Sequence, residues 1–558
     1  MPDQTSADLQ KKLAHIRRDA EERDAKRRAA ADGLTYIDLR KIPISLEALK
    51  LIPEEEARAA EMAAVEIKVR DLAVAAVDPK SEKVSAIIER LKSQRFETRV
   101  FIASRASLEE AWAMYKFVSE KEEDITGKFE INRVVELMKT MKSLQAVRSV
   151  IESFDFKKVT TTELFQTILG GALATHASDI HFEAGEIDTR LRYRLDGLLH
   201  DVFEHLPQRN YESIVSRIKL LSGLKINIHG EPQDGRFTIE LEKKEIEMRV
   251  SIIPSEFGET IVMRILDPDS INVTLEKLGL RADDLVIVQK ELAKPNGLIL
   301  NTGPTGSGKT TTLYAFLRHI VTPEIKIITV EDPIEYRVEG IEQTQTNADV
   351  GYTFAGGLRA ILRQDPDAIL IGEIRDLETA DIALQASLTG HMVFSTLHTN
   401  SAVGAVPRLI DLGVKPQTIG PALSLVIAQR LVRRLCKVCK KPADLPADFD
   451  ARVKAFFETL PARVDRTPYL KPTVFKAVGC DECSHLGFRG RVGIYEFLES
   501  SDEFQALILK DSSEVALRNY AERIGMVTMM MDGVLKVFSG ETSFDEVESV
   551  AGEISWIH

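Results

Sequence analysis

The segment Gly303–Thr310 constrains the fold of this chain more than any other feature. It reads GPTGSGKT, follows the apolar run Gly297–Leu300, and precedes the helix-compatible segment TTLYAFLRHI. A strand, a glycine-rich loop and a helix in this order are the context that a P-loop requires. An incidental glycine-rich turn is the alternative, but the length, the spacing and the flanking segments all agree with a P-loop. We therefore predict an α/β nucleotide-binding core of the P-loop, RecA-like class.

The residue types in this loop suit a nucleoside triphosphate with magnesium. Glycine at three positions lets backbone N–H groups approach phosphate oxygens where a side chain would obstruct them. A lysine supplies positive charge at the β- and γ-phosphates, and a threonine hydroxyl suits Mg²⁺, which prefers oxygen ligands. We expect ATP to be held by Gly303, Pro304, Thr305, Gly306, Ser307, Gly308, Lys309, Thr310 and Thr311, with Thr310 also contacting Mg²⁺.

An acidic pair follows a predicted strand downstream of the loop. The β-branched run Ile327–Val330 delivers Glu331 and Asp332 to the end of that strand, where Pro333 stops it. In a doubly wound sheet, residues at the carboxyl ends of strands face the ligand crevice. These acids are candidates for positioning water during hydrolysis, and the alternative is a helix cap or a solvated loop carboxylate.

A second predicted strand ends in a motif that resembles Walker B. The run Ala368–Ile371 is followed by Gly372 and Glu373, so glycine stands where an aspartate is common. Magnesium contact, through water, would then be made by Glu373. The alternative of a capping or solvated carboxylate applies here as well.

Two histidines lie close to a third predicted strand, Val393–Leu397. His398 directly follows that strand, so we expect it to point toward the crevice and to sense the γ-phosphate. For His391, a packed or surface position is as good an interpretation as a functional one.

The length and composition limit the classes of protein to consider. At 558 residues the chain is too long for one hydrophobic core, and three or four domains are expected. No apolar run approaches the roughly 20 residues that cross a bilayer, and the amino terminus is charged rather than signal-like. We therefore expect a cytoplasmic protein that reaches a membrane only through a partner or a surface contact. The net charge of −13 disfavours tracking along nucleic acid.

Changes in composition along the chain predict its domains. A charged segment at the amino terminus is interpreted as a solvated helical tail, with a docking helix as the alternative. The next domain has strands near residues 72–77 and 98–102 around a helix near 84–91, and we assign it to partner binding, with a purely structural role as the alternative. A polar linker, Ser119–Lys128, and a helix over residues 131–153 follow. The predicted boundaries are a tail at 1–33, an N-terminal α/β domain at 34–118, a linker with helix at 119–158, a second α/β segment at 159–270, and a P-loop domain at 271–558 that includes a four-cysteine subdomain at 430–492.

The cysteines form two CxxC pairs about forty residues apart. The chain has only four, Cys436, Cys439, Cys480 and Cys483. In a cytosolic chain this pattern indicates metal ligation more than a disulfide framework. Four thiolates satisfy tetrahedral Zn²⁺ and leave no open position, so we expect a structural zinc site. Redox-active dithiols are the alternative.

Several segments together resemble the type II secretion and type IV pilus assembly ATPase family. The runs GPTGSGKT, ITVEDPIEY, LRAILRQDPDAILIGEIRD and LTGHMVFSTLHTN are similar to its Walker A, Asp box, Walker B and His box, in the family's order. The resemblance extends upstream through ASDIHFE, RYRLDG, PQDGR and RVSIIPSEFGETIVMRIL, and downstream through QRLVRRLC, GRVGIYEF and DGVLKVFSGETSFDEV. It covers the chain from about Tyr36 to the end.

The resemblance implies roles for particular residues. Glu331 would be the catalytic glutamate that polarises water, and Glu373 the Walker B acid. The segment at 159–270 would be a PAS-like catalytic subdomain that lends arginine fingers to the nucleotide. The fingers would be Arg249 and Arg264, with Arg194 and Arg236 as weaker candidates and surface salt bridges as the alternative. The segment before PQDGR reads INIHGE, without the arginines often present there, so any role of those arginines does not transfer.

The resemblance also implies a function. It predicts a homo-hexameric motor in which the domain at Thr160–Pro268 closes on ATP and relaxes on product release. The motion would drive an inner-membrane platform protein that adds pilin or pseudopilin subunits, and the motor would lie at the inner membrane through that protein. The zinc insertion and the long amino-terminal domain favour assembly over pilus retraction. The alternatives are a DNA-uptake or conjugation ATPase and a nucleotide-binding scaffold with little turnover.

Overall fold

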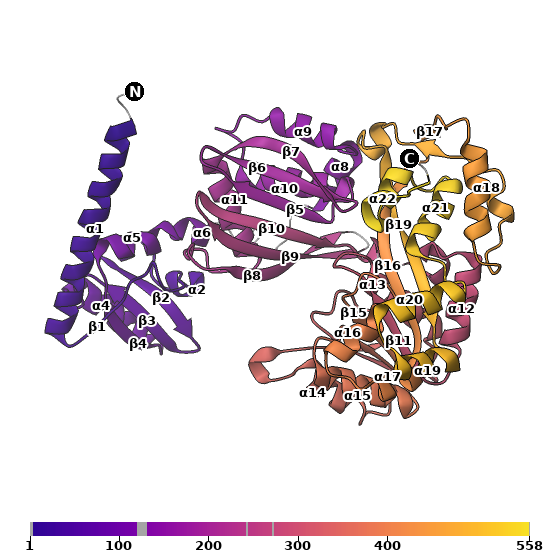
Figure 1. Cartoon of the computed structure of the whole chain (residues 1–558). Coiled ribbons are helices and arrows are strands. Elements are labelled where there is room, and N and C mark those ends of the chain that lie inside the picture. Colours follow the sequence, from indigo (N-terminus) through magenta and orange to yellow (C-terminus); the bar gives the residue numbers. More distant parts are fainter. Residues whose placement is uncertain (1–3, 120–130, 242–243, 271–272, 557–558) are drawn as a thin grey trace. The chain divides into compact units, whose positions relative to one another are not determined.

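In the computed structural model, residues 4–119, 131–241, 244–270 and 273–556 are described (Figure 1). The chain divides into two compact units. The first comprises residues 1–141, 145–195 and 199–265, and the second comprises residues 266–558 with the short segments 142–144 and 196–198. Among the described residues, no helix combines the length and the apolar character needed to cross a membrane.

The first helix of unit one, α1 (Gln4–Asp32), is docked on its own chain over the part whose side chains are described. It lies beside β1 and α5 (Figure 1), with Ala25 and Ala29 buried. Glu22 is also buried, and it accepts hydrogen bonds from the Tyr36 hydroxyl and, at 2.9 Å, from the Ser104 hydroxyl. The interpretation of this segment as a solvated tail is therefore wrong from about residue 22 onward, because its alanines and one acid pack against residues far along the sequence.

The N-terminal domain is a four-stranded sheet with helices around it. Its strand order is β1-β4-β3-β2, parallel between β1 and β4 and between β4 and β3, and antiparallel between β3 and β2. The predicted strands and helix are present as β3, β4 and α4, and α4 begins where the Ser81 hydroxyl accepts the N–H of Val84. The polar stretch 120–128 lies outside the described residues. The elements are β1 (Thr35–Tyr36), α2 (Leu46–Leu49), α3 (Glu54–Ala59), β2 (Met62–Lys68), β3 (Asp71–Ala76), α4 (Glu82–Ser93), β4 (Glu97–Ile102), α5 (Arg105–Ala113) and α6 (Tyr115–Ser119).

The helix predicted over residues 131–153 is two helices, α8 (Ile131–Thr140) and α9 (Leu144–Glu152). Both pack on α10 (Thr161–Ala174) at adjacent glycines. A Cβ on Gly170 would lie 3.0 Å from Leu137 of α8, and a Cβ on Gly171 would lie 2.7 Å from Val147 of α9. The single-helix prediction is wrong because the chain turns to place both pieces against these glycines.

The rest of unit one is a six-stranded sheet of order β7-β6-β5-β10-β9-β8. One face packs on α10 and α11 through its buried aromatic side chains: Phe182 stacks on Tyr211 of α11, and the Tyr193 hydroxyl donates to a carbonyl of α10 at 2.5 Å. The opposite face carries polar side chains at alternate positions, as the period of a strand requires. The elements are β5 (Asp179–Ala184), β6 (Asp188–Leu195), β7 (Leu198–Pro207), α11 (Gln208–Leu221), β8 (Gln233–Leu241), β9 (Lys244–Ser255) and β10 (Gly258–Leu266).

Unit two is built on a seven-stranded sheet of order β13-β12-β14-β15-β11-β16-β19. Neighbouring strands are parallel from β13 to β16, and only β19 is antiparallel. Because β11, β12, β14 and β15 are parallel, the residues that follow them emerge at one edge of the sheet. The predicted α/β class is confirmed. The elements of this part are α12 (Ala282–Leu292), β11 (Gly297–Thr302), α13 (Lys309–Ile320), β12 (Ile327–Glu331), β13 (Glu342–Gln345), α14 (Phe354–Ile361), β14 (Ala368–Ile371), α15 (Leu377–Leu388), β15 (Met392–Leu397), α16 (Ala405–Asp411), α17 (Pro416–Ala422), β16 (Leu423–Leu435) and β19 (Phe488–Glu499).

The cysteine-containing insertion connects β16 to β19. It holds a two-stranded sheet of β17 (Lys441–Pro442) and β18 (Phe475–Lys476) and the helix α18 (Phe449–Thr459). The ends of β16 and β19 within the predicted bounds 430–492 belong to the main sheet, so the insertion itself occupies residues 436–487. The chain then continues through α19 (Asp502–Lys510), α20 (Glu514–Arg523), α21 (Met529–Phe538) and α22 (Phe544–Ala551).

Candidate nucleotide site and metal centre

The P-loop joins the carboxyl end of β11 to the amino end of α13. Gly308 is the N-cap of α13 and has a φ of 89°, a left-handed conformation that favours glycine. The first N–H groups of a helix have no partner within it, and they carry partial positive charge. The start of α13 is therefore suited to bind a phosphate, as the sequence predicts.

Lys309 lies within the curve of the loop. Its Nζ donates to the carbonyl oxygens of Gly303, at 2.7 Å, and Pro304, at 3.1 Å. Burial lowers the pKa of Lys309, and the nearby carboxylate of Glu373 acts in the opposite direction. A bound anion would favour the charged form of this amine in the same way.

The structure brings Glu373 and His398 together beside Lys309. The Glu373 side chain is 15% exposed; one of its oxygens pairs with the Arg375 guanidinium, and the other lies 3.5 Å from His398 Nε2. The close surroundings of Gly372 explain why glycine stands where an aspartate is common in Walker B motifs. A Cβ there would lie 3.3 Å from the Phe354 ring and 3.4 Å from the Cα of Glu331. A longer side chain would have little space.

Glu331 occupies a closed hydrogen-bond network. It is 3% exposed; one carboxyl oxygen accepts from the Tyr314 hydroxyl, and the other accepts from Thr329 Oγ1 at 2.5 Å and Gln343 Nε2 at 3.2 Å. Burial holds the pKa of Glu331 above its ordinary value, although these three donors act in the opposite direction. The carboxyl therefore takes a proton more readily than an ordinary glutamate.

Sequence reasoning missed the three partners of this carboxyl. Tyr314 is four residues after Thr310 on α13, so the two side chains lie on the same face of this helix. This spacing could have indicated from the sequence that Tyr314 faces the site. Gln343 lies on the edge strand β13, and no sequence pattern marks it. Its Nε2 also reaches the Tyr314 hydroxyl at 3.3 Å, so one amide contacts both the Glu331 carboxyl and the hydroxyl that donates to it.

His391 and Asp332, the other two candidates near these strands, lie at opposite edges of the sheet. His391 precedes β15, so it lies at the amino end of the strand, the opposite edge from the P-loop, where its Nδ1 is 3.0 Å from a backbone carbonyl. That contact fits a packed histidine. Asp332 is exposed at the edge where the P-loop lies.

The four candidate arginines share the polar face of the six-stranded sheet in unit one. Arg264 Nε lies 3.0 Å from one oxygen of the buried Asp179, and Arg194 Nε lies 3.5 Å from the other. Arg236 is directly opposite Arg249 in the β8–β9 register. Arg249 Nε lies 3.2 Å from Glu247 Oε1, so three of these guanidinium groups contact carboxylates of the same sheet. Their assignment as fingers stays a prediction.

The segment INIHGE, which lacks the family's arginines, places a largely exposed histidine beside a buried ion pair. His229 Nδ1 lies 2.6 Å from Glu259 Oε2, and the fully buried Lys219 Nζ lies 2.7 Å from Glu259 Oε1. Burial lowers the pKa of Lys219, against the effect of Glu259. The buried cation at this place is therefore Lys219, which pairs with Glu259.

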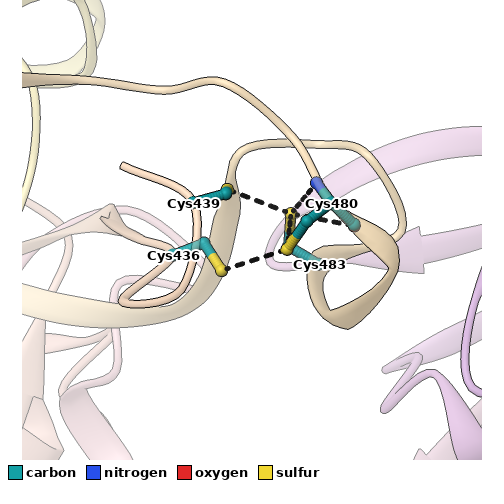
Figure 2. A group of neighbouring side chains, drawn as sticks. All are labelled: Cys436, Cys439, Cys480 and Cys483. Carbon is teal, nitrogen blue, oxygen red and sulfur yellow. Dashed lines mark hydrogen bonds between the residues drawn. The ribbon is translucent and has the colours of Figure 1, made fainter. Parts of the chain in front are cut away.

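The four cysteines converge on one point (Figure 2), and none is bonded to another. Their sulfur atoms all lie within 4.8 Å of one another, and three of the separations are 3.9, 3.8 and 3.8 Å. Backbone N–H groups point at two of the sulfurs: Gly479 at Cys439, 3.3 Å, and Gly487 at Cys483, 3.3 Å. A tetrahedron with metal–sulfur bonds of about 2.3 Å has sulfur–sulfur edges of about 3.8 Å. The cluster can therefore hold a metal ion of that size.

Family profiles and known proteins match long segments of this chain. A family profile described as "Type II/IV secretion system protein" matches residues 156–549, and one described as "MshEN domain" matches residues 33–121. The chain is 38% identical over 522 residues to the type IV pilus assembly ATPase PilB of Myxococcus xanthus, covering 92% of this chain and 88% of that protein. It is 47% identical over 391 residues to the type II secretion system protein E of Pseudomonas aeruginosa, covering 70% and 75%.

A solved structure shares the fold. The Legionella pneumophila ATPase DotB matches with a TM-score of 0.51 at 22% identity, over 70% of this chain and 95% of that one. Likeness at this identity concerns the fold alone. The profile match over most of the chain and the identity with PilB are decisive for membership: the chain belongs to the type II/IV secretion system protein family, and it is an ATPase of that family.

Proposed function

We propose that this chain is a motor that hydrolyses ATP to assemble type IV pilus or type II pseudopilus subunits. The observation that carries the proposal is the grouping of Lys309, Glu373 and His398 at the P-loop edge of a parallel sheet. It is supported by similarity over 92% of the chain to a protein named a pilus assembly ATPase.

Each residue of the site has a role in the proposed reaction. The P-loop amides and Lys309 bind the phosphates, and His398 senses the γ-phosphate from its contact with Glu373. Mg²⁺ would be held by the Thr310 hydroxyl and, through water, by Glu373, and it would neutralise charge on the phosphates. These are hard oxygen donors, which suit that ion. Glu331 polarises the attacking water when its carboxyl is ionised.

The four cysteines hold Zn²⁺ in this proposal. The sulfur separations of 3.8 to 3.9 Å fit a tetrahedral thiolate site, and four protein ligands leave no position for a substrate. The ion is therefore structural. Redox chemistry of the dithiols is the competing interpretation, and the metal content of the purified protein decides between them.

The finer parts of the proposal concern assembly. The motor is a homo-hexamer in which Arg249 and Arg264 act as arginine fingers when the domain at 159–270 closes on ATP. It lies on the cytoplasmic side of the inner membrane, bound through a platform protein that receives the motion and adds pilins or pseudopilins. Both type IV pilus assembly and type II secretion fit the proposal, because relatives named for each machine match most of the chain.

The test begins with Lys309→Ala. Without the ammonium at the phosphates, ATP hydrolysis by the purified full chain should fall on the order of a hundredfold. The matched control is Lys290→Ala, which removes a largely exposed lysine paired with Glu499 in the same unit and should leave turnover unchanged. Hydrolysis by Lys309→Ala at the rate of the parent would refute the site.

The assembly role needs a second measurement. Co-purification from the native cell should recover an inner-membrane platform protein together with pilins or pseudopilins, and the class of pilin separates the two machines. Hydrolysis stimulated by DNA, with salt-sensitive DNA binding, would instead support a DNA-handling motor. Single-turnover rates unchanged by Glu331→Gln and Glu373→Gln would indicate a scaffold with little turnover.

A further inference from the structure

A buried glutamine lies beside the first residue of the P-loop. Gln429 is on β16, next to β11, and it is 2% exposed. In the β11–β16 register Thr302 lies opposite Ala428, so the next residue of β16, Gln429, is level with Gly303. A buried side-chain amide is costly unless its donors and acceptors form hydrogen bonds.

The Gln429 amide oxygen connects the strand that enters the P-loop with the helix that leaves it. Oε1 accepts from Asn301 Nδ2 at 2.9 Å and from Thr312 Oγ1 at 2.9 Å. Asn301 is on β11, two residues before the loop, and Thr312 is near the start of α13. Both partners are fully buried. One acceptor therefore holds the two ends of the loop at a set separation.

Two glycines of the loop also face Gln429. A Cβ on Gly303 would lie 2.5 Å from the backbone carbonyl oxygen of Gln429, and a Cβ on Gly308 would lie 2.8 Å from the side-chain Nε2 of Gln429. Such distances are shorter than a carbon–oxygen or carbon–nitrogen contact allows. The loop thus contacts the backbone of β16 at its first residue and the Gln429 side chain at its last glycine, and a side chain at either glycine position would collide with β16.

We propose that Gln429 is a positioning residue for nucleotide binding. From β16 it holds the two ends of the P-loop and so sets the direction of the backbone N–H groups of the loop. It touches the loop and its two flanking elements rather than the phosphates, so it acts through the loop. Because a preorganised loop reduces the cost of binding, loss of this support should weaken binding more than the chemical step. The inference rests on ATP binding at the P-loop, which is part of the proposed function.

The decisive variant is Gln429→Met, which keeps the length of the side chain and removes the acceptor. Loss of one well-formed buried hydrogen bond corresponds to about a tenfold change in an equilibrium constant. We expect the Kd for a fluorescent ADP analogue and the KM for ATP to rise about tenfold, with kcat within about twofold of the parent. Thr312→Val removes one of the two donors, and it should raise the same Kd by a smaller factor.

A double-mutant cycle separates positioning from general stability. The effects of Gln429→Met and Thr312→Val on the Kd should be less than additive, since both remove the same hydrogen bond. The matched control is Ser424→Ala, a buried polar residue of the same strand whose hydroxyl contacts Glu291 at the other end of β16. It should lower the unfolding temperature and leave the Kd unchanged.

The outcomes distinguish this inference from the proposed function. If Gln429→Met lowers the unfolding temperature as Ser424→Ala does but leaves both Kd and KM at parental values, Gln429 is structural only and the inference is overturned. If Lys309→Ala also binds the analogue normally, the P-loop site itself is wrong. Should Gln429→Met fail to fold, an unchanged Kd in Thr312→Val overturns the inference by itself.

Discussion

Removing the Tyr314 hydroxyl should shift the pH dependence of ATP hydrolysis. Tyr314 is fully buried, and its hydroxyl donates to the Glu331 carboxyl that we propose as the group polarising water. Burial and the adjacent Glu331 raise the pKa of Tyr314, so this hydroxyl stays a donor at every pH of interest. The perturbation is Tyr314→Phe, which removes the donor and keeps the ring.

The sign follows from which form of Glu331 the hydroxyl favours. A donor stabilises the carboxylate, so its loss raises the pKa of Glu331 further above the ordinary value. The neighbouring carboxylate of Glu335 acts in the same direction, and the donors Thr329 and Gln343 remain. A hydrogen bond to a charged group contributes about 1.5–3 kcal/mol, and one pKa unit corresponds to about 1.4 kcal/mol. Because two donors remain, we take the lower end and expect a shift of about one unit.

The assay is the pH profile of kcat/KM, which reports ionisations of the free enzyme. Hydrolysis requires the carboxylate, so the acid limb of the profile should move up by about one pH unit in Tyr314→Phe. It should disappear in Glu331→Gln, whose residual rate no longer depends on this proton.

The control is Tyr495→Phe, in the same unit. Tyr495 is equally buried, but its hydroxyl donates to the carbonyl of Leu278 at 3.1 Å and contacts the Thr312 side chain instead of a carboxylate, so the control concerns the position of the acid limb and not the KM. Its acid limb should stay at the parental position. An unmoved limb in Tyr314→Phe, or an equal shift in both tyrosine variants, would refute the reasoning.

Two further predictions concern stability. Chelation, or the variant Cys439→Ser, should lower the zinc content from about one ion per chain, as measured by metal analysis. In thermal unfolding, residues 436–487 should then unfold first. A metal-free chain with unchanged thermal unfolding would contradict the zinc site. Asp532→Asn should cost about 3 kcal/mol in urea unfolding, because Lys536, 2.6 Å from this fully buried carboxylate, loses its partner, whereas Arg281 keeps its pairs with Asp283 and Asp284. Burial acts to raise the pKa of Asp532, but Lys536 and Arg281 hold it below its ordinary value. The stabilisation by Asp532 is therefore complete above the ordinary pKa of an aspartate and is lost as the pH falls through the lowered value. Equal acid sensitivity of the parent and Asp532→Asn would argue against this ion pair.

Local patterns were sufficient for the core of the fold. The run Gly297–Leu300 and the glycines after it predict β11, the P-loop and α13, and the apolar runs before Glu331 and Glu373 predict β12 and β14. Strand periodicity and the residues that end strands are properties of neighbouring positions, so they can be read directly. The edge at which these residues emerge followed from the parallel order alone.

Contacts between distant segments were beyond those patterns. The helix α1 is docked because Glu22 meets Ser104, 82 positions later, and the 131–153 segment is broken because Gly170 and Gly171 accept two helices. Neither partner is visible in the segment concerned, since each depends on the packing of another element.

The sequence by itself determined the chemistry available at the site: a phosphate-binding loop, acids and a histidine after neighbouring strands, and four thiols in two pairs. Only the tertiary structure decided how those groups are held. It enclosed Glu331 among Tyr314, Thr329 and Gln343, placed Gln429 under the loop, and brought the sulfurs to within 4.8 Å of one another. The physical reason is that residue types and spacing specify local conformation, whereas burial and hydrogen-bond partners arise from strands and helices that meet only when the whole chain has folded.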